Sequence, residues 1–485
     1  FMGYREFAGY IHKVANIEDA QLDSAKITKF QKKKLQKIFN NRLVIIDEVH
    51  NIRLLGTSDK HDKKIANSLT KLVKYTDNMR LLLLSGTPMY NHYSEIIWLI
   101  NLMNLNDNRS AVGKNDIFDK YGNFIKDKEG NEIGKDLFIH KITGYVSFIR
   151  GENPYIFPYR IYPELFDKEK SLKSMNYPRL SLNSKPIENP IQYMDLYLNK
   201  LHPYQENVYK YIIDSFVKNY QKKKDFEDID RFGYDDLKYP LESLNIVYPI
   251  EDFNPESKIS INKLVGKNGL QRILNVHSKN NDTIRQYEYK NDIEKKFGRI
   301  FSLSEINKYS SKIFSICTNI LNSDGVVLVY SQYIEGGLIP MALALEELGF
   351  SRYGESLSIF KDTKNIKKNN MKYVMITGNI AHSKDNVEEI KAATNIDNIY
   401  GEKVKVILIS RAGSEGIDFK YIRQVHILEP WYNTSRLEQI IGRAIRSKSH
   451  CDLPFKKRNV QLFLHGTITD EEETADLYIY RVAES

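Results

Sequence analysis

Short apolar runs bounded by polar residues recur along the chain, and their length decides which element each one predicts. The run at 43–46 has four residues, mostly β-branched, and is too short for a buried helix. It therefore predicts a fully buried parallel strand. Runs of the same kind predict further strands at 81–84, 326–330, 373–376, 404–409 and 424–428.

Apolar residues at the three- and four-residue spacing of amphipathic helices lie between these runs. After about residue 306 the predicted strands alternate with helices, which favours a parallel, doubly wound sheet. The spacing predicts helices within 1–40, 51–77, 96–100, 204–216, 310–321, 341–348 (ended by Gly349) and 470–485.

The pattern loosens between 151 and 305, which we interpret as a connector followed by a mainly helical insertion. Two prolines, six aromatics and two glycines in 144–162 indicate a rigid connector. Arg150 and Arg160 within it could contact phosphates, although packing of the aromatic rings is the simpler role. The predicted division is therefore 1–150, 151–305 and 306–485.

Composition adds little to the prediction of the fold but limits the classes of binding partner to be expected. The net charge of +9 over 485 residues favours a polyanionic partner. Two cysteines far apart argue against a disulfide framework and fit a reducing compartment inside the cell. No apolar run approaches the roughly 18 residues needed to span a bilayer, so no membrane partner is expected.

The strand at 43–46 is followed by Asp47, Glu48 and His50, at the end where open α/β sheets bind ligands. On an extended backbone, adjacent side chains point to opposite faces. One of the two carboxylates, Asp47 or Glu48, can then hold Mg²⁺ through water while the other orients or deprotonates an attacking water. For this tetrapeptide alone, a solvent-facing strand end is an equally good interpretation.

Two other segments carry candidate chemistry. The turn after the strand at 404–409 contains Gly413 and Gly416, where the backbone can approach a ligand, and Asp418, which can reach a ribose or an arginine. Gln439, Arg443 and Arg446 are spaced to project from one face of a helix. Two guanidinium groups there can offset the charge that develops on a transferred γ-phosphoryl group.

Taken together and in this order, 47–50, Ser85-Gly86-Thr87-Pro88 and 439–446 resemble motifs II, III and VI of superfamily 2 helicases and translocases. The stretches Arg5-Glu6-Phe7, Arg150-Gly151-Glu152-Asn153-Pro154-Tyr155 and 157–163 are similar to a viral branch of that superfamily. This branch contains poxvirus nucleoside triphosphatase I and the early transcription factor ATPase subunit, and it is allied to the Swi/Snf translocases.

The resemblance implies two RecA-like lobes, the first incomplete, and a DNA-dependent ATPase that uses ATP and Mg²⁺. It implies catalytic roles for Glu48, Arg443 and Arg446, and nucleotide contacts from Asp47, His50, Gly416, Asp418 and Gln439. Ser85, Gly86 and Thr87 would couple hydrolysis to movement. Duplex DNA and viral RNA polymerase or transcription factor subunits would be the partners, in the virion and the host cytoplasm.

One departure from the family pattern changes the expectation for this chain. No Gly-x-x-x-x-Gly-Lys-Ser/Thr phosphate loop occurs anywhere in the sequence. We therefore expect a fragment that hydrolyses ATP negligibly alone. A non-catalytic DNA-binding or scaffolding module and a cellular Swi/Snf-type remodelling ATPase are the alternatives.

Overall fold

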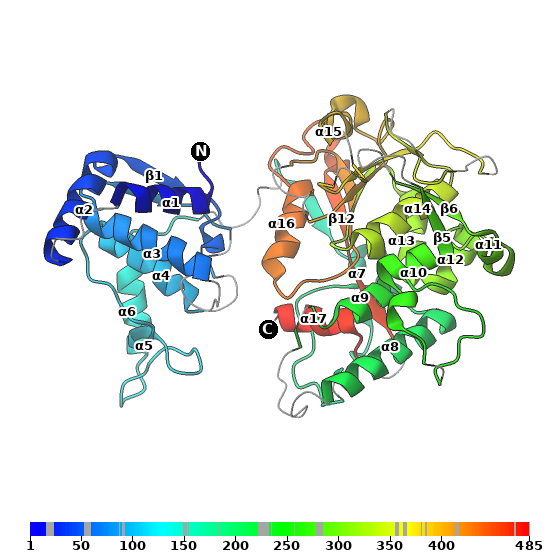
Figure 1. The fold of residues 1–485 in the computed structure, drawn as a ribbon, viewed down its shortest axis with the longest axis horizontal. Helices are drawn as coiled ribbons and strands as arrows, with labels where there is room; N and C mark the ends of the chain where they lie inside the picture. Colours follow the sequence, from blue (N-terminus) through cyan, green and yellow to red (C-terminus); the bar gives the residue numbers. More distant parts are fainter. Residues whose placement is uncertain are drawn as a thin grey trace. The chain divides into compact units, whose positions relative to one another are not determined.

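A computed structural model describes most of the chain, and its contacts divide into two compact units, Phe1–Gly151 and Glu152–Ser485. Each unit is considered by itself (Figure 1). The described residues are 1–15, 24–52, 60–86, 88–89, 93–148, 153, 155–182, 184–221, 232–233, 235–256, 258–277, 285–354, 358–361, 366–379, 381–383, 386–411, 413, 417–469 and 472–484.

The first unit is a helical layer packed against a short parallel sheet. Its two strands, β1 (Leu43–Ile46) and β2 (Arg80–Leu83), pair in register from Leu43 with Arg80 to Ile46 with Leu83. The predicted strands and helices of this part are confirmed. The helices are α1 (Tyr4–Ala15), α2 (Ser24–Phe39), α3 (Lys60–Tyr75), α4 (Glu95–Asn106), α5 (Lys114–Ile117) and α6 (Ile133–Ile142).

The predicted full burial of the 43–46 strand is wrong. Val44 and Ile46 pack into the core formed with α1, α2, α3 and α4. Leu43 and Ile45 point to the opposite face and are 59% and 56% exposed. Side chains alternate along a strand, so helices on one side of a sheet bury only every second residue. No described residue buries this second face.

The second unit is built around an eight-stranded parallel sheet, which confirms the predicted α/β class. Seven strands follow the order β3-β12-β11-β7-β10-β9-β8, and β4 extends β12. The strands are β3 (Tyr159–Ile161), β4 (Tyr197–Lys200), β7 (Val326–Tyr330), β8 (Ser351–Arg352), β9 (Lys372–Ile376), β10 (Val406–Ile409), β11 (Ile422–Ile427) and β12 (Asn459–Ile468). A separate antiparallel hairpin pairs β5 (Leu274–His277) with β6 (Gln286–Tyr289).

Helices cover both faces of this sheet. Val327 and Val329 of β7 enter a core with α13 and α14, whereas Val326, Leu328 and Tyr330 enter a second core with α16 and α17. The helices are α7 (Pro163–Phe166), α8 (Pro203–Gln221), α9 (Lys238–Asn245), α10 (Gly266–Ile273), α11 (Asn291–Phe297), α12 (Leu303–Tyr309), α13 (Ser311–Asn322), α14 (Ile339–Glu347), α15 (Asn386–Thr394), α16 (Thr434–Ala444) and α17 (Ala475–Glu484).

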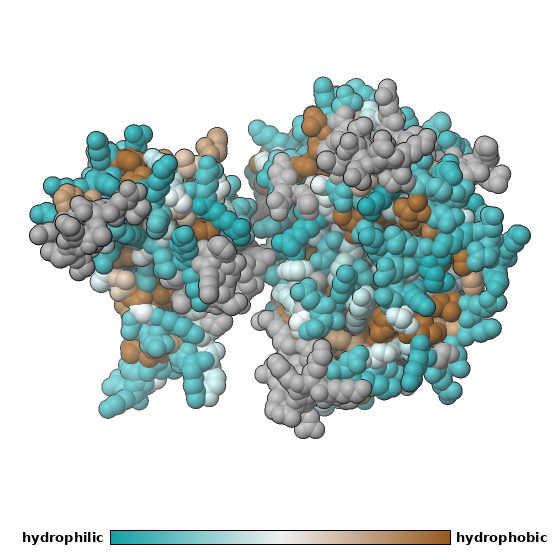
Figure 2. All heavy atoms as spheres, viewed as in Figure 1, coloured by the Kyte–Doolittle hydropathy of each residue, from teal (hydrophilic) through white to brown (hydrophobic). Residues whose placement is uncertain are grey.

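The segment predicted as connector and insertion lies in the second unit where it is described. Part of the aromatic connector, Tyr159–Ile161, is strand β3 at the edge of the large sheet, beside β12. Helix α9 packs on α8, α13 and α17. The surface of both units is mainly hydrophilic with scattered hydrophobic patches (Figure 2). No described helix is long and apolar enough to cross a bilayer.

Candidate functional site

The acidic residues follow β1 in a turn rather than in a continued strand. Glu48 adopts the left-handed conformation, with φ 48° and ψ 45°. The expected alternation of Asp47 and Glu48 along an extended backbone is therefore wrong. Asp47 instead folds back, and its Oδ1 accepts a hydrogen bond from the Glu48 amide at 3.0 Å. A left-handed non-glycine residue costs free energy, and such residues cluster at functional sites.

The two predicted motifs of the first unit meet through His50. Its Nδ1 lies 2.9 Å from the Ser85 hydroxyl and 3.3 Å from Oε2 of Glu48. The His50 side chain is buried, whereas that of Glu48 is about half exposed. The backbones also join, because Val49 donates to the Leu84 carbonyl at 3.0 Å. A change at the end of β2 can thus reach the Glu48 carboxylate through one imidazole.

Tyr4 was not among the predicted site residues, yet its hydroxyl contacts the backbone of this turn. Its hydroxyl donates to the Asp47 carbonyl and lies 3.3 Å from that of Glu48. Burial raises the pKa of Tyr4, so the hydroxyl keeps its proton and remains a donor. Tyr4 lies next to the Arg5-Glu6-Phe7 stretch that carried part of the family resemblance, which was the only signal for it in the sequence.

The carboxylates of this turn fit a hydrated Mg²⁺ better than an ion enclosed by protein. Asp47 is exposed to solvent. Within the described residues no group of three His, Cys, Asp or Glu side chains could hold a metal. Mg²⁺ usually keeps several waters and binds one or two carboxylates together with substrate phosphates.

Of the other predicted residues in the segment after β2, Gly86 lies in open space, and Thr87 falls outside the described residues.

Helix α16 presents the predicted arginine motif of the second unit. Asn433 caps its first turn, accepting the Ser435 amide at 2.7 Å on its side-chain oxygen. Leu437, Ile440 and Ile441 are buried in the core of the sheet. Gln439 is left exposed on the surface of the helix.

Asp418 brings the two arginines together. Its carboxylate lies 3.9 Å from Nη1 of Arg443 and forms an ion pair with Arg446. The prediction that both arginines project from one helix face is wrong, because α16 ends at Ala444 and Arg446 lies in the following loop. The loop nevertheless turns Arg446 back toward the end of α16. Arg443 and Arg446 thus share Asp418 as a partner without lying on one helix face.

Ser449 and His450 shape that loop and were not predicted. The Ser449 hydroxyl donates to the Arg446 carbonyl at 2.8 Å, and it lies 2.8 Å from Nδ1 of His450. Nε2 of His450 lies 2.7 Å from the Ile422 carbonyl of β11. Burial lowers the pKa of His450 to about 4, so the ring is neutral and can donate to that carbonyl. Both side chains are buried and belong to no motif, so neither could be expected from the sequence.

Gly413 serves a packing role rather than the expected approach to a ligand. A Cβ at this position would lie 1.9 Å from the Ile376 carbonyl oxygen at the end of β9. Only glycine therefore lets the loop after β10 pass that strand end. Gly416 lies outside the described residues. Asp418 belongs to the described residues, is exposed and contacts both arginines.

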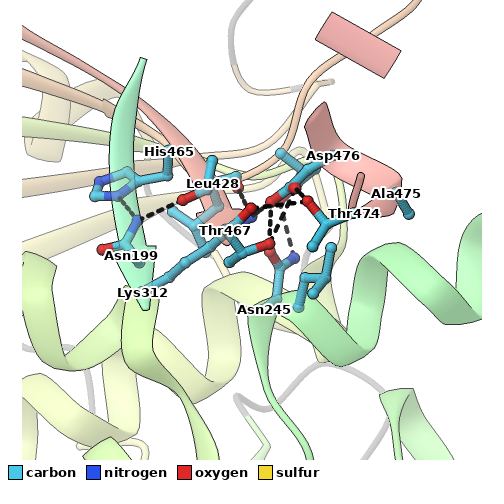
Figure 3. A network of polar contacts seen from close by, with 12 residues as sticks. Asn199, Asn245, Lys312, Leu428, His465, Thr467, Thr474, Ala475 and Asp476 are labelled. Atoms are coloured by element: carbon cyan, nitrogen blue, oxygen red, sulfur yellow. Dashed lines mark hydrogen bonds and ion pairs between the residues drawn. The ribbon is translucent and has the colours of Figure 1, made fainter. Parts of the chain in front are cut away.

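Two buried acidic networks support the carboxyl end of the sheet. Glu429, after β11, accepts hydrogen bonds from the Ser331 hydroxyl at 2.8 Å and the Asn245 amide at 2.9 Å. Lys312 and Asp476 form a fully buried ion pair at 2.8 Å (Figure 3). Lys312 also donates to the Leu428 carbonyl at 2.6 Å. These networks tie α9, α13 and α17 to the sheet.

The connector strand reaches the arginine helix directly. Nη1 of Arg160, on β3, donates to both carboxylate oxygens of Glu438 at 3.2 and 2.8 Å. Arg160 therefore pairs with a carboxylate of the protein. Arg150 lies outside the described residues.

Comparison with known proteins agrees with this architecture. The family model described as helicase conserved C-terminal domain matches residues 311–448, so the second unit carries such a domain. A protein of Acanthamoeba polyphaga mimivirus whose name describes an ATP-dependent RNA helicase is 28% identical over 88% of this chain and 60% of its own length. Nucleoside triphosphatase I of Melanoplus sanguinipes entomopoxvirus is 27% identical over 90% and 59%.

The termination factor NPH-I homolog of African swine fever virus (isolate Pig/Kenya/KEN-50/1950) is 23% identical over 89% of this chain and 57% of its own length. The chain thus spans about 60% of the length of these curated relatives. Among solved structures, the C-terminal part of the Fun30 ATPase domain matches at 13% identity and a TM-score of 0.34, covering 61% of this chain and 90% of that one. The Sulfolobus solfataricus SWI2/SNF2 ATPase core in complex with dsDNA matches at 13% identity and 0.26, covering 95% and 67%.

Proposed function

We propose that this chain, which carries a helicase C-terminal domain and is related to viral nucleoside triphosphatases, is the motor part of a DNA-dependent ATPase acting in viral transcription. The observation that carries the proposal is the convergence of Arg443 and Arg446 on Asp418 where α16 ends, close to the start of β11. Two guanidinium groups held there are suited to a triphosphate.

Each proposed role follows from the local geometry. Glu48 orients the attacking water or accepts its proton, since its half-exposed carboxylate is held beside a buried imidazole. Asp47 holds Mg²⁺ through water, and the ion when bound offsets charge on the phosphates. Arg443 and Arg446 leave Asp418 for the γ-phosphate as its charge develops. Gln439, exposed on the same helix, and Gly416 contact the nucleotide.

Coupling to DNA is proposed through the first unit. The His50–Ser85 contact joins the acidic turn to the segment Ser85, Gly86 and Thr87. Hydrolysis at the acidic turn would shift that segment and thereby move bound duplex DNA. One viral relative is named as a termination factor, which supports a role in transcription. Polymerase or transcription factor subunits are the partners we propose, and the virion and host cytoplasm are the proposed locations. Neither strand separation nor a cellular remodelling role is favoured by a specific contact.

Binding of duplex DNA is the first test. A surface that tracks phosphates releases counterions on binding, so affinity should fall steeply with salt. We expect a fluorescent 30-base-pair duplex to lose about 10-fold or more in affinity between 50 and 200 mM salt. A binding constant that does not respond to salt would contradict a phosphate-tracking surface.

ATP hydrolysis is the second test and separates the motor from a non-catalytic DNA-binding module. The chain by itself contains no phosphate loop of the Gly-x-x-x-x-Gly-Lys-Ser/Thr type, so we expect negligible turnover from residues 1–485. A longer product of the same reading frame that contains such a loop should hydrolyse ATP faster when duplex DNA is added. DNA binding without any hydrolysis in that longer product would favour the scaffolding alternative.

A further inference from the structure

A cavity of about 450 Å³ opens between α9, the start of α10 and the segment that follows β7. None of its lining residues belongs to the ATPase site proposed above. Its floor is formed by Glu242, Val265 and Gly266, which are buried. Its walls are half-buried, and its rim is exposed. The wall and rim residues that the argument uses are Gln332, Tyr333, Glu335, Lys238, Tyr239 and Lys267.

Glu242 is the unusual feature of the floor. The residue is only 5% exposed, yet its carboxylate makes no hydrogen bond or ion pair within the described part of the chain. A buried charge without a partner is costly, so an unused carboxylate that lines a cavity points to a ligand. Burial raises the pKa of Glu242 to about 7; Glu335 and Glu429 act in the same direction, and Lys238 opposes them.

Two glycines make room for this carboxylate. A Cβ on Gly266 would lie 2.7 Å from Oε2 of Glu242, and a Cβ on Gly336 would lie 2.7 Å from Oε1. Gly266 also has a positive φ of 61°, which other residues rarely adopt. The backbone on both sides thus passes close to the two acceptor oxygens of Glu242, a residue that lines the cavity.

Charge reverses from the floor to the rim. Lys238 and Lys267 are exposed at the mouth, and each lies in the first turn of a helix, α9 or α10. Neither helix has a side-chain cap on its first turn. The first N–H groups of a helix lack partners within it and attract anions. A ligand that matches this gradient has hydrogen-bond donors at its inner end and negative charge at its outer end.

We propose that this cavity binds a guanine nucleotide, with the base on the floor and the phosphate at the rim. The N1–H and the exocyclic amine of guanine lie side by side and match the two oxygens of one carboxylate. Adenine and cytosine each place a ring acceptor beside their amine. The carboxylate that Glu242 carries at pH above its raised pKa of about 7 repels this acceptor, so guanine is preferred there. Tyr333 and Tyr239 line the cavity and offer aromatic rings for stacking, and Gln332 lines it beside them.

The lysines at the rim disfavour a basic peptide, which is the competing class of ligand. An arginine side chain would also satisfy Glu242 and stack on tyrosine, but a basic peptide would have to pass Lys238 and Lys267. A nucleotide phosphate gains from the same two charges. The guanine could belong to a free nucleotide or to a single-stranded nucleic acid, and the two sources share this chemistry.

Titration calorimetry on purified residues 1–485 tests the site without any need for ATP hydrolysis. We expect GMP to bind at least 10-fold more tightly than AMP, CMP or free arginine, and IMP, which lacks the exocyclic amine, to fall between GMP and AMP. Glu242→Gln should weaken GMP binding at least 10-fold, because the amide replaces an acceptor with a donor. Glutamine has the same shape and no charge to bury, so this variant should fold. Glu256→Gln, on the exposed surface, is the matched control.

Two further arms locate the source and the orientation. An oligo-dT with one central dG, compared with plain oligo-dT, reports a guanine taken from a strand; GMP binding without this difference assigns a free nucleotide. Lys267→Ala should weaken GMP more than guanosine, since only GMP carries the phosphate. Equal binding of all nucleotides, arginine binding tighter than GMP, or GMP and dG binding that Glu242→Gln leaves unchanged would overturn the proposal.

Discussion

Strands β1 and β7 have the same kind of sequence, Leu-Val-Ile-Ile and Val-Val-Leu-Val-Tyr, but different surroundings. Every residue of β7 is buried, because helices cover both faces of its sheet. In β1, Leu43 and Ile45 remain exposed while Val44 and Ile46 pack inward. An apolar run thus specifies a strand, whereas the number of buried faces depends on what packs against the sheet. Candidate site residues follow both strands at their carboxyl ends: Asp47 and Glu48 after β1, and the cavity residues Gln332 and Tyr333 after β7. A strand therefore need not be buried on both faces to carry such residues.

The largest expected effect on the free energy of unfolding comes from the fully buried ion pair between Lys312 and Asp476 in the second unit. The described residues of the first unit contain no such pair. Asp476→Ala would leave Lys312 charged in the core and remove the acceptor of the Thr467 and Thr474 hydroxyls. Removing one partner of such a pair costs about 3–5 kcal/mol. Urea unfolding followed by the fluorescence of Trp431, in a Trp98→Phe background, measures the second unit alone.

The control for this prediction replaces the whole pair. Lys312→Met with Asp476→Leu removes both charges and should cost less than Asp476→Ala alone. A single variant as stable as the parent would show that the pair does not stabilise the unit.

A matched pair of truncations tests the comparison of the two strands directly. Leu328→Ala, in β7, removes buried methyl groups and should cost about 2–5 kcal/mol. Ile45→Ala, on the open face of β1, should cost less than about 1 kcal/mol. The fluorescence of Trp98 in urea reports the first unit. Equal costs for the two truncations would mean that the open face of β1 is covered in solution.

Four strands of the large sheet could be predicted, because β7, β9, β10 and most of β11 are apolar, whereas β3, β4 and β8 are too short or too polar to stand out. Strand β12 was missed because polar residues interrupt its pattern. Gln461 and His465 are nevertheless half or fully buried, since they hydrogen-bond with Gln424 at 3.0 Å and with His426 at 3.0 Å on the neighbouring strand. Partners that satisfy a buried polar side chain come from elsewhere in the chain, so local periodicity does not detect them.

The site residues could be predicted only where a motif marked them. Asp47, Glu48, Arg443 and Arg446 were found from their spacing, and the structure brings both arginines to Asp418. Tyr4 and His450, which position them, act through tertiary hydrogen bonds. The end of α16 before Arg446 also depends on the loop that Ser449 folds back, which no helical spacing reveals.

A smaller, pH-dependent effect comes from Glu242. Its pKa is raised to about 7 from 4.5, so the folded state binds its proton more tightly than the unfolded state. The stability this contributes is fully present below about pH 4.5 and is lost as pH rises through about 7. Glu242→Gln has no carboxyl group to titrate and does not lose this stability. The free energy of unfolding of the variant minus that of the parent should therefore rise by up to about 3 kcal/mol from pH 4.5 to pH 8. Urea unfolding at the two values measures it, and an unchanged difference would show that the carboxylate is solvated.

The central claim is that Arg443, although paired with Asp418 in this structure, acts in ATP hydrolysis. The most direct test is DNA-stimulated ATP turnover by Arg443→Ala in the longer reading-frame product, with Glu48→Gln as the inactive reference and Lys448→Ala as the surface control. If Arg443 contacts mainly transition-state charge, its removal should lower ATP turnover about 100-fold or more. ATP affinity and melting temperature should stay near the parental values. A variant that turns over at the parental rate, or one that melts early because the Arg443–Asp418 contact stabilises the fold, would contradict the claim.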